Sequence, residues 1–399
     1  MEQQLHVWFR YASALGIQTG SAHSPQNQQT TELYSARTKR RSAFSQTTKA
    51  LFARLQRGYG YALLLWVFAV YINGLYCRRR IPSAMLTWLV ATILFTVQAI
   101  TNVLIIAETL WKQQEHEAFL LLLQRIAFAF KLRLRQPIEQ QQFVLNLRRH
   151  LCYLLTISLM GLWLFLLTTF WLQYIGYFWY GLWFIITMRV RIIQLLIYLR
   201  VLRHYMRCLC KQLCQIVAYH TAPNSQMLDY NCAKLLTLEY LLAVKDIYAL
   251  LYEAFHLLNE FAGWSLCSII TCCMLDISCN IYWSQLSLDG NASRRYYYIA
   301  SVWWLCPMIA IVWHICQLSD ACKQLDRLIA NFLSKIIINS SLRSLRSYRL
   351  CLQQFTMQLQ LLPIKVSAKG FFILDMPLLM SIFIAISAYL VILRQFVNF

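Results

Sequence analysis

The residues of this chain best suited to binding chemistry are aromatic, and they gather in one short stretch. Nine of the fifteen residues from Phe170 to Phe184 are Phe, Tyr or Trp. Amphipathic rings of this kind anchor helices at the headgroups of a bilayer. They can also line a pocket that binds an apolar or cationic small molecule through stacking and cation–π contacts. Both interpretations stay open, and the candidate pocket residues, two of them on a later stretch, are Trp171, Tyr174, Tyr177, Tyr180, Trp183, Trp303 and Trp304.

Three polar side chains stand inside otherwise apolar runs. Gln98 and Asn102 lie one helical turn apart, and polar groups placed in this way most often hydrogen-bond a neighbouring helix. A ligand contact is the alternative. Asp276 is a carboxylate within an apolar run, which makes it a candidate functional group. A structural pairing with Arg294 or Arg295 explains Asp276 equally well.

Residues for catalysis or metal binding are not grouped in a pattern that such chemistry requires. The chain lacks a His-Glu-x-x-His motif, a Gly-x-Ser-x-Gly nucleophile turn and a glycine-rich phosphate loop. Cys208, Cys210 and Cys214 have no matching second half for a metal site. We therefore expect no enzyme activity, no metal and no cofactor.

Composition places these residues in a membrane. Of the 399 residues, 59% are hydrophobic and 13% charged, whereas soluble domains carry roughly 25% charged residues. The excess lies in long uncharged runs, each able to cross a bilayer as a helix. The longest run, Leu151 to Met188, has to fold back, and its turn is predicted at Gln173 to Gly176. The expected fold is all-α with seven transmembrane helices, at about 58–77, 83–107, 151–172, 174–198, 261–283, 296–318 and, last, within 370–399.

Basic residues predict the orientation of these helices. Residues 1–57, 108–150, 189–246 and 320–369 hold 31 Lys and Arg, and the other connections and the C-terminus hold 6. Because basic loops stay in the cytosol, the N-terminus is predicted to be cytosolic and the C-terminus extracellular. The net charge of +21 is accordingly interpreted as suited to contact with anionic lipid rather than with nucleic acid. Asn291, in the sequon Asn291-Ala-Ser293, then lies in an external loop and is the expected glycosylation site.

Two of the basic regions have the pattern of long helices. In 189–260, Val190, Ile193 and Leu196 recur at helical spacing, so the fourth span is expected to continue into the cytosol. Residues 320–369 repeat the pattern and are expected to form cytosolic anchor helices. The apolar faces of these helices either pack within one chain or join subunits. The domains expected are thus a cytosolic segment 1–57, spans one to six in 58–319, the anchor 320–369 and a last span in 370–399.

The end of the last span resembles a known family. Its sequence, Ser387-Ala-Tyr-Leu-Val-Ile-Leu-Arg-Gln-Phe396, is similar to the C-terminal signature of insect gustatory receptors, which is Thr-Tyr, five hydrophobic residues and Gln-Phe. Tyr389, Gln395 and Phe396 match at the right spacing. Ala388 stands where the family has Thr, and Arg394 where it has a hydrophobic residue. Chain length, topology and helical extensions resemble that family over essentially the whole chain.

The resemblance implies a gustatory receptor that acts as a tastant-gated, non-selective cation channel in the plasma membrane of gustatory receptor neurons. Four subunits, in a homo-tetramer or a hetero-tetramer with other gustatory receptors, would surround a pore lined by the last span. Gln395 and Phe396 would form the gate, with Val391, Ile392 and Ala388 along the pore. No feature indicates a sugar, which favours an aversive, bitter-type tastant. A G-protein-coupled receptor, which has an external N-terminus, and a secondary transporter, which usually has internal repeats, are the alternatives.

Overall fold

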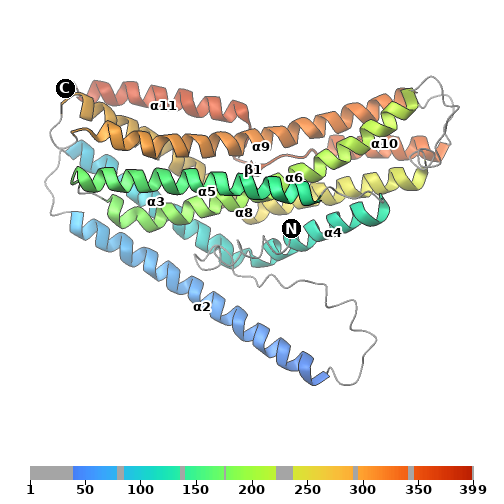
Figure 1. Cartoon of the computed structure of the whole chain (residues 1–399), viewed down its shortest axis with the longest axis horizontal. Coiled ribbons are helices and arrows are strands. Elements are labelled where there is room, and N and C mark those ends of the chain that lie inside the picture. The colour runs from blue at the N-terminus through green and yellow to red at the C-terminus, as the bar shows by residue number, and fades with distance from the viewer. Residues whose placement is uncertain are drawn as a thin grey trace.

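The fold is a long bundle in which most helices run close to one common axis, while the first described helix diverges from the bundle towards its N-terminal end (Figure 1). The computed structural model describes residues 39–78, 85–134, 140–174, 177–221, 237–290, 295–339 and 346–397. The helices are α2 (Lys39–Arg78), α3 (Met85–Trp111), α4 (Gln113–Arg133), α5 (Gln140–Trp171), α6 (Phe178–Thr221), α8 (Leu238–Leu288), α9 (Tyr297–Asn339), α10 (Arg346–Leu361) and α11 (Met376–Val397). Two short antiparallel strands, β1 (Ser367–Ala368) and β2 (Phe372–Ile373), precede α11.

The helices confirm an all-α membrane protein with six to seven candidate spans. Among the described residues, α2, α3, α5, α6, α8 and α9 are each long and apolar enough to cross a bilayer. In α11 the apolar part, Met376–Ile392, is shorter than the six others. A seventh span therefore depends on α11, which the sequence predicted as the last span.

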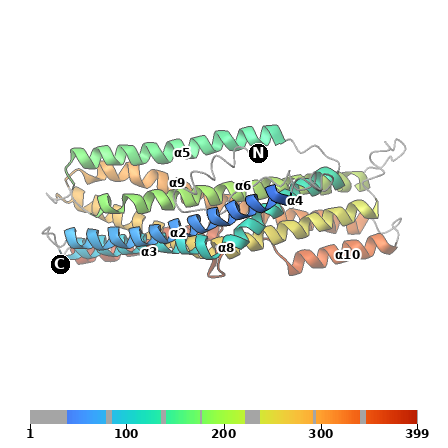
Figure 2. The ribbon, with the colours of Figure 1, turned by 90° about the horizontal axis from the view of Figure 1, so that it is seen from below.

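Three helices are much longer than a bilayer requires. Helices α6, α8 and α9 have 44, 51 and 43 residues. At 1.5 Å per residue each is roughly twice as long as the ~30 Å hydrocarbon core. Their far halves pass through the stretches in which the sequence predicted amphipathic helices, and they form the second half of the bundle with α4 and α10 (Figures 1 and 2).

The structure differs from the sequence prediction at two places. Helix α4 was not predicted, because residues 108–150 were assigned only by their basic charge. Helix α2 begins at Lys39, well before the predicted start at residue 58. Helix α11 begins at Met376, within the predicted range 370–399, after Lys369 and Gly370, with positive φ angles of 50° and 81°, turn the chain between β1 and β2. Asp375 then accepts the Leu378 amide at 3.1 Å and is the N-terminal cap of α11.

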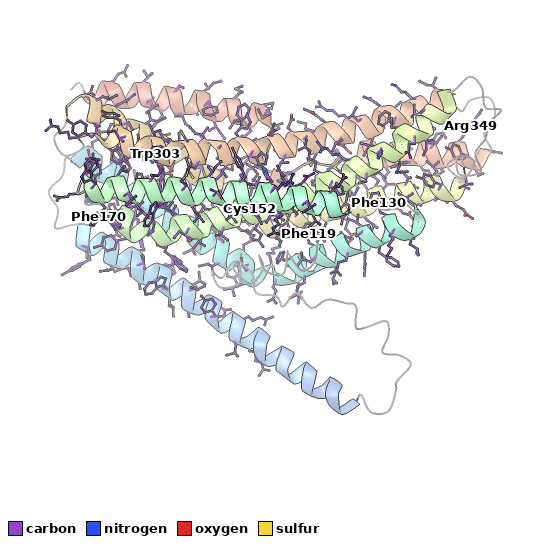
Figure 3. The ribbon with its side chains drawn as sticks, in the orientation of Figure 1. Phe119, Phe130, Cys152, Phe170, Trp303 and Arg349 are labelled. Carbon is purple, nitrogen blue, oxygen red and sulfur yellow. The ribbon has the colours of Figure 1, made fainter. Side chains whose placement is uncertain are left out.

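Apolar side chains fill the bundle along its whole length (Figure 3). The larger core cluster holds Phe119, Phe130 and Tyr205 in the half that contains α4. The smaller cluster holds Phe95 and Phe184 between α3 and α6 in the other half. Large apolar side chains of α2 and α5 are exposed, among them Leu65, Trp66, Leu159 and Trp163. We infer that these two helices present their outer faces to lipid.

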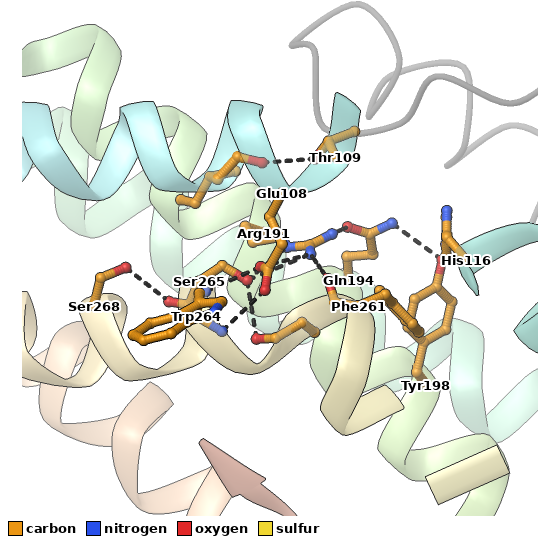
Figure 4. Close-up of polar contacts among 12 residues, drawn as sticks. Glu108, Thr109, His116, Arg191, Gln194, Tyr198, Phe261, Trp264, Ser265 and Ser268 are labelled. Carbon is orange, nitrogen blue, oxygen red and sulfur yellow. Dashed lines mark hydrogen bonds and ion pairs between the residues drawn. The ribbon is translucent and has the colours of Figure 1, made fainter. Parts of the chain in front are cut away.

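A buried ion pair joins three helices where the two halves of the bundle meet (Figure 4). Glu108 of α3 lies 3.7 Å from Arg191 of α6, and their side chains are 4% and 2% exposed. The Glu108 carboxylate also accepts the backbone amides of Trp264 and Ser265 of α8, at 2.9 and 3.0 Å. Since helix amides normally bond only within their own helix, this carboxylate fixes the position of α8 relative to α3.

The polar network extends from Arg191 to α4. The Arg191 guanidinium donates to Gln194 Oε1 at 2.9 Å, and Gln194 Nε2 donates to the Tyr198 hydroxyl at 3.0 Å. That hydroxyl lies 2.7 Å from His116 Nε2 of α4. Burial, together with the nearby Arg191 charge, lowers the pKa of His116 to about 3. The imidazole is therefore neutral at physiological pH and extends the network without adding a charge.

We expect Glu108→Gln to be strongly destabilising. The substitution leaves the Arg191 guanidinium buried without its counter-charge, which costs about 3–5 kcal/mol in comparable cases. Thermal unfolding of the detergent-purified protein measures the effect. Glu115→Gln is the matched control, because Glu115 is 34% exposed and pairs with Lys112 on the surface, where an ion pair contributes about 1 kcal/mol or less. Equal melting temperatures for the two variants would contradict the assigned role of Glu108.

Candidate functional site

A partly open cavity lies between α3, α5, α6, α8 and α9, in the half of the bundle that contains the smaller core cluster. Its volume is about 80 Å³, several times the roughly 10–15 Å³ that one water molecule requires. The walls combine aromatic and aliphatic side chains with a few polar ones. The lining residues are Ala91, Leu94, Phe95, Gln98, Phe165, Thr169, Tyr174, Tyr177, Phe178, Ile185, Asp276, Asn280, Trp283, Tyr297 and Trp304.

Aromatic contacts hold the cavity walls in place. Phe95 of α3 stacks on Tyr177 with ring centroids 4.8 Å apart. Phe165 of α5 contacts Phe178 and Trp304 with centroid distances of 4.7 Å in each case. These rings come from α3, α5, α6, α9 and the turn before α6, so each wall depends on a different helix. Such pairs contribute about 0.5–1.5 kcal/mol each beyond the area they bury.

One side of the cavity is polar. The Asp276 carboxylate of α8 accepts the Trp304 indole N–H at 2.6 Å and the Asn280 amide at 3.0 Å. Asn280 in turn accepts the Tyr297 hydroxyl at 2.9 Å. Asp276 and Asn280 stand one helical turn apart on the same face of α8, which brings both to the cavity.

A buried arginine lies behind this polar side. The Arg189 guanidinium, on α6, is 4.9 Å from the centre of the Trp304 ring and donates to the Ser158 carbonyl at 2.7 Å. Its charge interacts favourably with that of Asp276. Arg295, the partner that the sequence suggested for Asp276, instead lies over the Tyr296 ring at 5.1 Å. Arg294 is outside the described residues.

The two polar residues of α3 have different roles. Asn102 donates to the Phe184 carbonyl of α6 at 3.1 Å, which confirms the predicted bond between helices. Gln98 lines the cavity. No hydrogen bond of its side chain is present within the described part of the chain, so its amide is available to a molecule in the cavity.

The structure brings three of the seven predicted pocket residues together. Tyr174, Tyr177 and Trp304 line the cavity. Trp171, 83% exposed, lies in an open crevice at the end of α5, and Trp303 is 39% exposed. Trp303 and Phe170 lie at the same end of the bundle (Figure 3), where exposed rings suit an interfacial belt. Tyr180 and Trp183, both half-buried, are not among the lining residues.

Several lining residues were not predicted as a pocket. Phe95 and Phe165 are apolar residues in apolar runs, and nothing in their spacing distinguishes them from ordinary core. Phe178 lies in the aromatic stretch but was not among the candidate pocket residues. Asn280 was detectable, because it stands four residues after Asp276 in the same apolar run and therefore shares its helical face.

The predicted pore residues are separate from the cavity. On α11, Val391 and Ile392 are 61% and 49% exposed, and Ala388 and Gln395 are exposed too. The side chain of Phe396 and the predicted glycosylation site Asn291 lie outside the described residues.

Comparison with known proteins identifies the family. A family model described as 7tm Chemosensory receptor matches residues 5–397. The chain belongs to this chemosensory receptor family. The resemblance drawn from the C-terminal residues is thereby confirmed, and the family is one of receptors and not of enzymes.

Two fruit-fly relatives and a solved structure are similar to this receptor. Gustatory receptor 39b of Drosophila melanogaster is 30% identical over 55% of the chain, and gustatory receptor 23a of the same species is 31% identical over 38%. The matches span 59% and 41% of those relatives. The insect olfactory receptor OR5 from Machilis hrabei, in complex with eugenol, has a similar fold, with a TM-score of 0.61 at 11% identity over 99% of both chains.

We expect Asp276→Leu to destabilise the receptor more than Asp276→Asn. Leucine leaves the Trp304 indole without its acceptor and removes the carboxylate charge near Arg189, with an expected loss of about 3 kcal/mol or more. Asparagine keeps one acceptor oxygen and should cost less. Thermal unfolding in detergent compares the two, with the exposed Asp289→Asn as the control. A similar loss of stability from both substitutions would contradict the role of the Asp276 side-chain oxygen as a hydrogen-bond acceptor.

Proposed function

We propose that this receptor is a gustatory receptor that forms a tastant-gated, non-selective cation channel in the plasma membrane. The observation that carries the proposal is the aromatic cavity, whose apolar walls with a few polar groups have the lining typical of a site for a small organic ligand. The similar fold of an olfactory receptor in complex with eugenol supports this use of the cavity. The proposed orientation has a cytosolic N-terminus, an extracellular C-terminus and a glycan at Asn291, in agreement with the basic residues of the sequence.

The cavity favours an apolar, aversive (bitter-type) compound over a sugar. Its tyrosine hydroxyls already bond within the protein and offer a ligand few free donors, since Tyr174 donates to the Arg295 carbonyl, Tyr177 bonds with Thr92 at 3.0 Å and Tyr297 donates to Asn280. A sugar buried there would leave several hydroxyls without partners, at a cost of about 1–3 kcal/mol each. An aromatic ligand with one polar group can instead stack on the rings and hydrogen-bond Gln98.

Helix α11 supports the proposed pore. Leu379, Ile382 and Ile386 pack it against the bundle. Its opposite side carries a stripe of side chains spaced three or four residues apart, and all of them are exposed in the single chain: Ile384, Ala388, Val391 and Gln395. Four copies around an axis would cover these side chains and form a narrow, mostly apolar conduit that can close by dewetting.

Helix α10 supports assembly into a tetramer. It is not among the candidate spans, yet Leu350, Met357 and Leu361 are 51%, 61% and 74% exposed. These positions share one helical face. An apolar face outside the membrane favours contact with another subunit, which agrees with an anchor below the membrane.

We expect Ala91→Phe to reduce tastant sensitivity at least tenfold. The added ring fills a cavity of about 80 Å³ and competes directly with a ligand. Dose–response measurements of activating tastants, with surface expression measured in parallel, test this. Ala62→Phe, on an exposed face of α2, is the matched control. If Ala91→Phe does not reach the surface, Gln98→Leu is used in its place, and unchanged sensitivity in a surface-expressed cavity variant excludes the cavity as the ligand site.

We expect cells that express the chain to show cation currents in response to compounds from a tastant panel. Gln395→Ala should alter conduction or gating, because four such side chains would form the narrowest ring. Ser387→Ala is the control, since it is exposed on the same helix but about 80° from Gln395. If Gln395→Ala reaches the surface with unchanged currents and reversal potential, α11 does not line the pore at this residue.

A further inference from the structure

A basic cluster lies between α5, α6 and α9, away from the cavity. It contains His150 of α5, Arg200 and Arg203 of α6, and His314 of α9. His150 Nε2 and His314 Nε2 are 2.8 Å apart, and Arg200 Nη2 is 3.3 Å from the same His314 nitrogen. Because the arginine can only donate, His314 Nε2 is the acceptor and His150 Nε2 the donor.

The cluster has more donors than protein acceptors. Nε of Arg200 and Nε of Arg203 are buried and have no hydrogen-bond partner among the described residues. The charges of Arg203 and Arg207, on the same helix, repel that of Arg200. None of the ion pairs among the described residues involves Arg200, Arg203 or Arg207. Buried donors of charged groups require a partner.

The surrounding helices supply no compensating carboxylate. Helices α5 and α6 contain no Asp or Glu at all. The two acids of α9 accept hydrogen bonds from other residues, Asp320 from Gln324 at 2.8 Å and Asp326 from the Tyr248 hydroxyl at 2.9 Å, and neither forms a described ion pair with Arg200 or Arg203. Among the described residues of these three helices, the cluster therefore has no direct counter-charge.

The cluster lies one bilayer thickness from the opposite end of its helices. Arg200 is 22 residues from the first residue of α6, Phe178, and His150 is 21 residues from the last residue of α5, Trp171. At 1.5 Å per residue both separations are about 32 Å, close to the hydrocarbon thickness. Because α5 presents exposed apolar side chains such as Leu159 and Trp163, membrane lipid reaches the edge of the cluster.

We propose that Arg200 and Arg203, supported by His150 and His314, bind the phosphate groups of an anionic membrane lipid. Guanidinium groups present paired N–H donors that match phosphate oxygens. Basic pockets between transmembrane helices on the cytosolic side are suited to such headgroups, and the assignment to that leaflet rests on the proposed orientation. A metal ion is the wrong ligand, because Arg200 occupies the lone pair of His314 and its charge repels cations.

Thermal unfolding of the purified full chain in detergent tests the proposal without any current measurement. The probe is dioctanoyl phosphatidylinositol 4,5-bisphosphate, compared with dioctanoyl phosphatidylcholine and with free inositol 1,4,5-trisphosphate. We expect only the phosphatidylinositol bisphosphate to raise the melting temperature of the unsubstituted protein, by about 2 °C or more near saturation. No rise in the parent overturns the proposal. An equal rise with inositol trisphosphate overturns the assignment to lipid and indicates a soluble phosphate ligand.

Two double variants with the same change of charge locate the site. R200Q/R203Q should abolish the rise, whereas R148Q/R149Q, which removes two exposed charges of α5 nearby, should keep it. The single variant R203Q leaves the bond from Arg200 to His314 in place and should weaken the apparent affinity at least tenfold, which provides a second measure if the double variant does not fold. An undiminished rise in R203Q or R200Q/R203Q overturns the assignment to this cluster.

Discussion

Glu108 and Arg191 are opposite charges buried between helices, and each requires the other as its counter-charge. This requirement fixes the positions of α3 and α6 along the bundle. The same carboxylate accepts two amides of α8, so it fixes a third helix. Through Gln194 and Tyr198 the network reaches α4. The half of the bundle that contains α4 is thereby joined to the half that contains the cavity.

The cavity depends on the helices that this network positions. Gln98 stands ten residues before Glu108 on α3, and Asp276 stands eleven residues after Ser265 on α8. A shift of α3 against α8 at the cavity therefore has to be accommodated at Glu108, where two backbone hydrogen bonds and an ion pair oppose it. Since a ligand changes a conformational equilibrium only by its differential affinity for the two states, the strength of this network limits how far a ligand can move these helices.

Charge is distributed unevenly along the same helices. Helix α6 carries Arg189 beside the cavity, Arg191 in the network and Arg200 and Arg203 at the lipid boundary, with no acidic residue of its own. Each arginine consequently takes its contacts from elsewhere: Ser158 of α5 for Arg189, Glu108 of α3 for Arg191 and, as proposed, a lipid phosphate for Arg200 and Arg203. The basic residues that indicate orientation in the sequence thus also serve as contacts between helices.

The sequence alone determined that the chain forms helices long enough to span a bilayer, because backbone groups in lipid must bond within their own segment. It also identified Asn102 as a contact between helices and the aromatic stretch as a region of interest. It could not separate Tyr177, which lines the cavity, from Trp183, which does not, nor pair Asp276 with Trp304 or Glu108 with Arg191. Only the tertiary structure decided these, because core and lipid are equally apolar and hydrophobic pattern does not specify which helix faces meet.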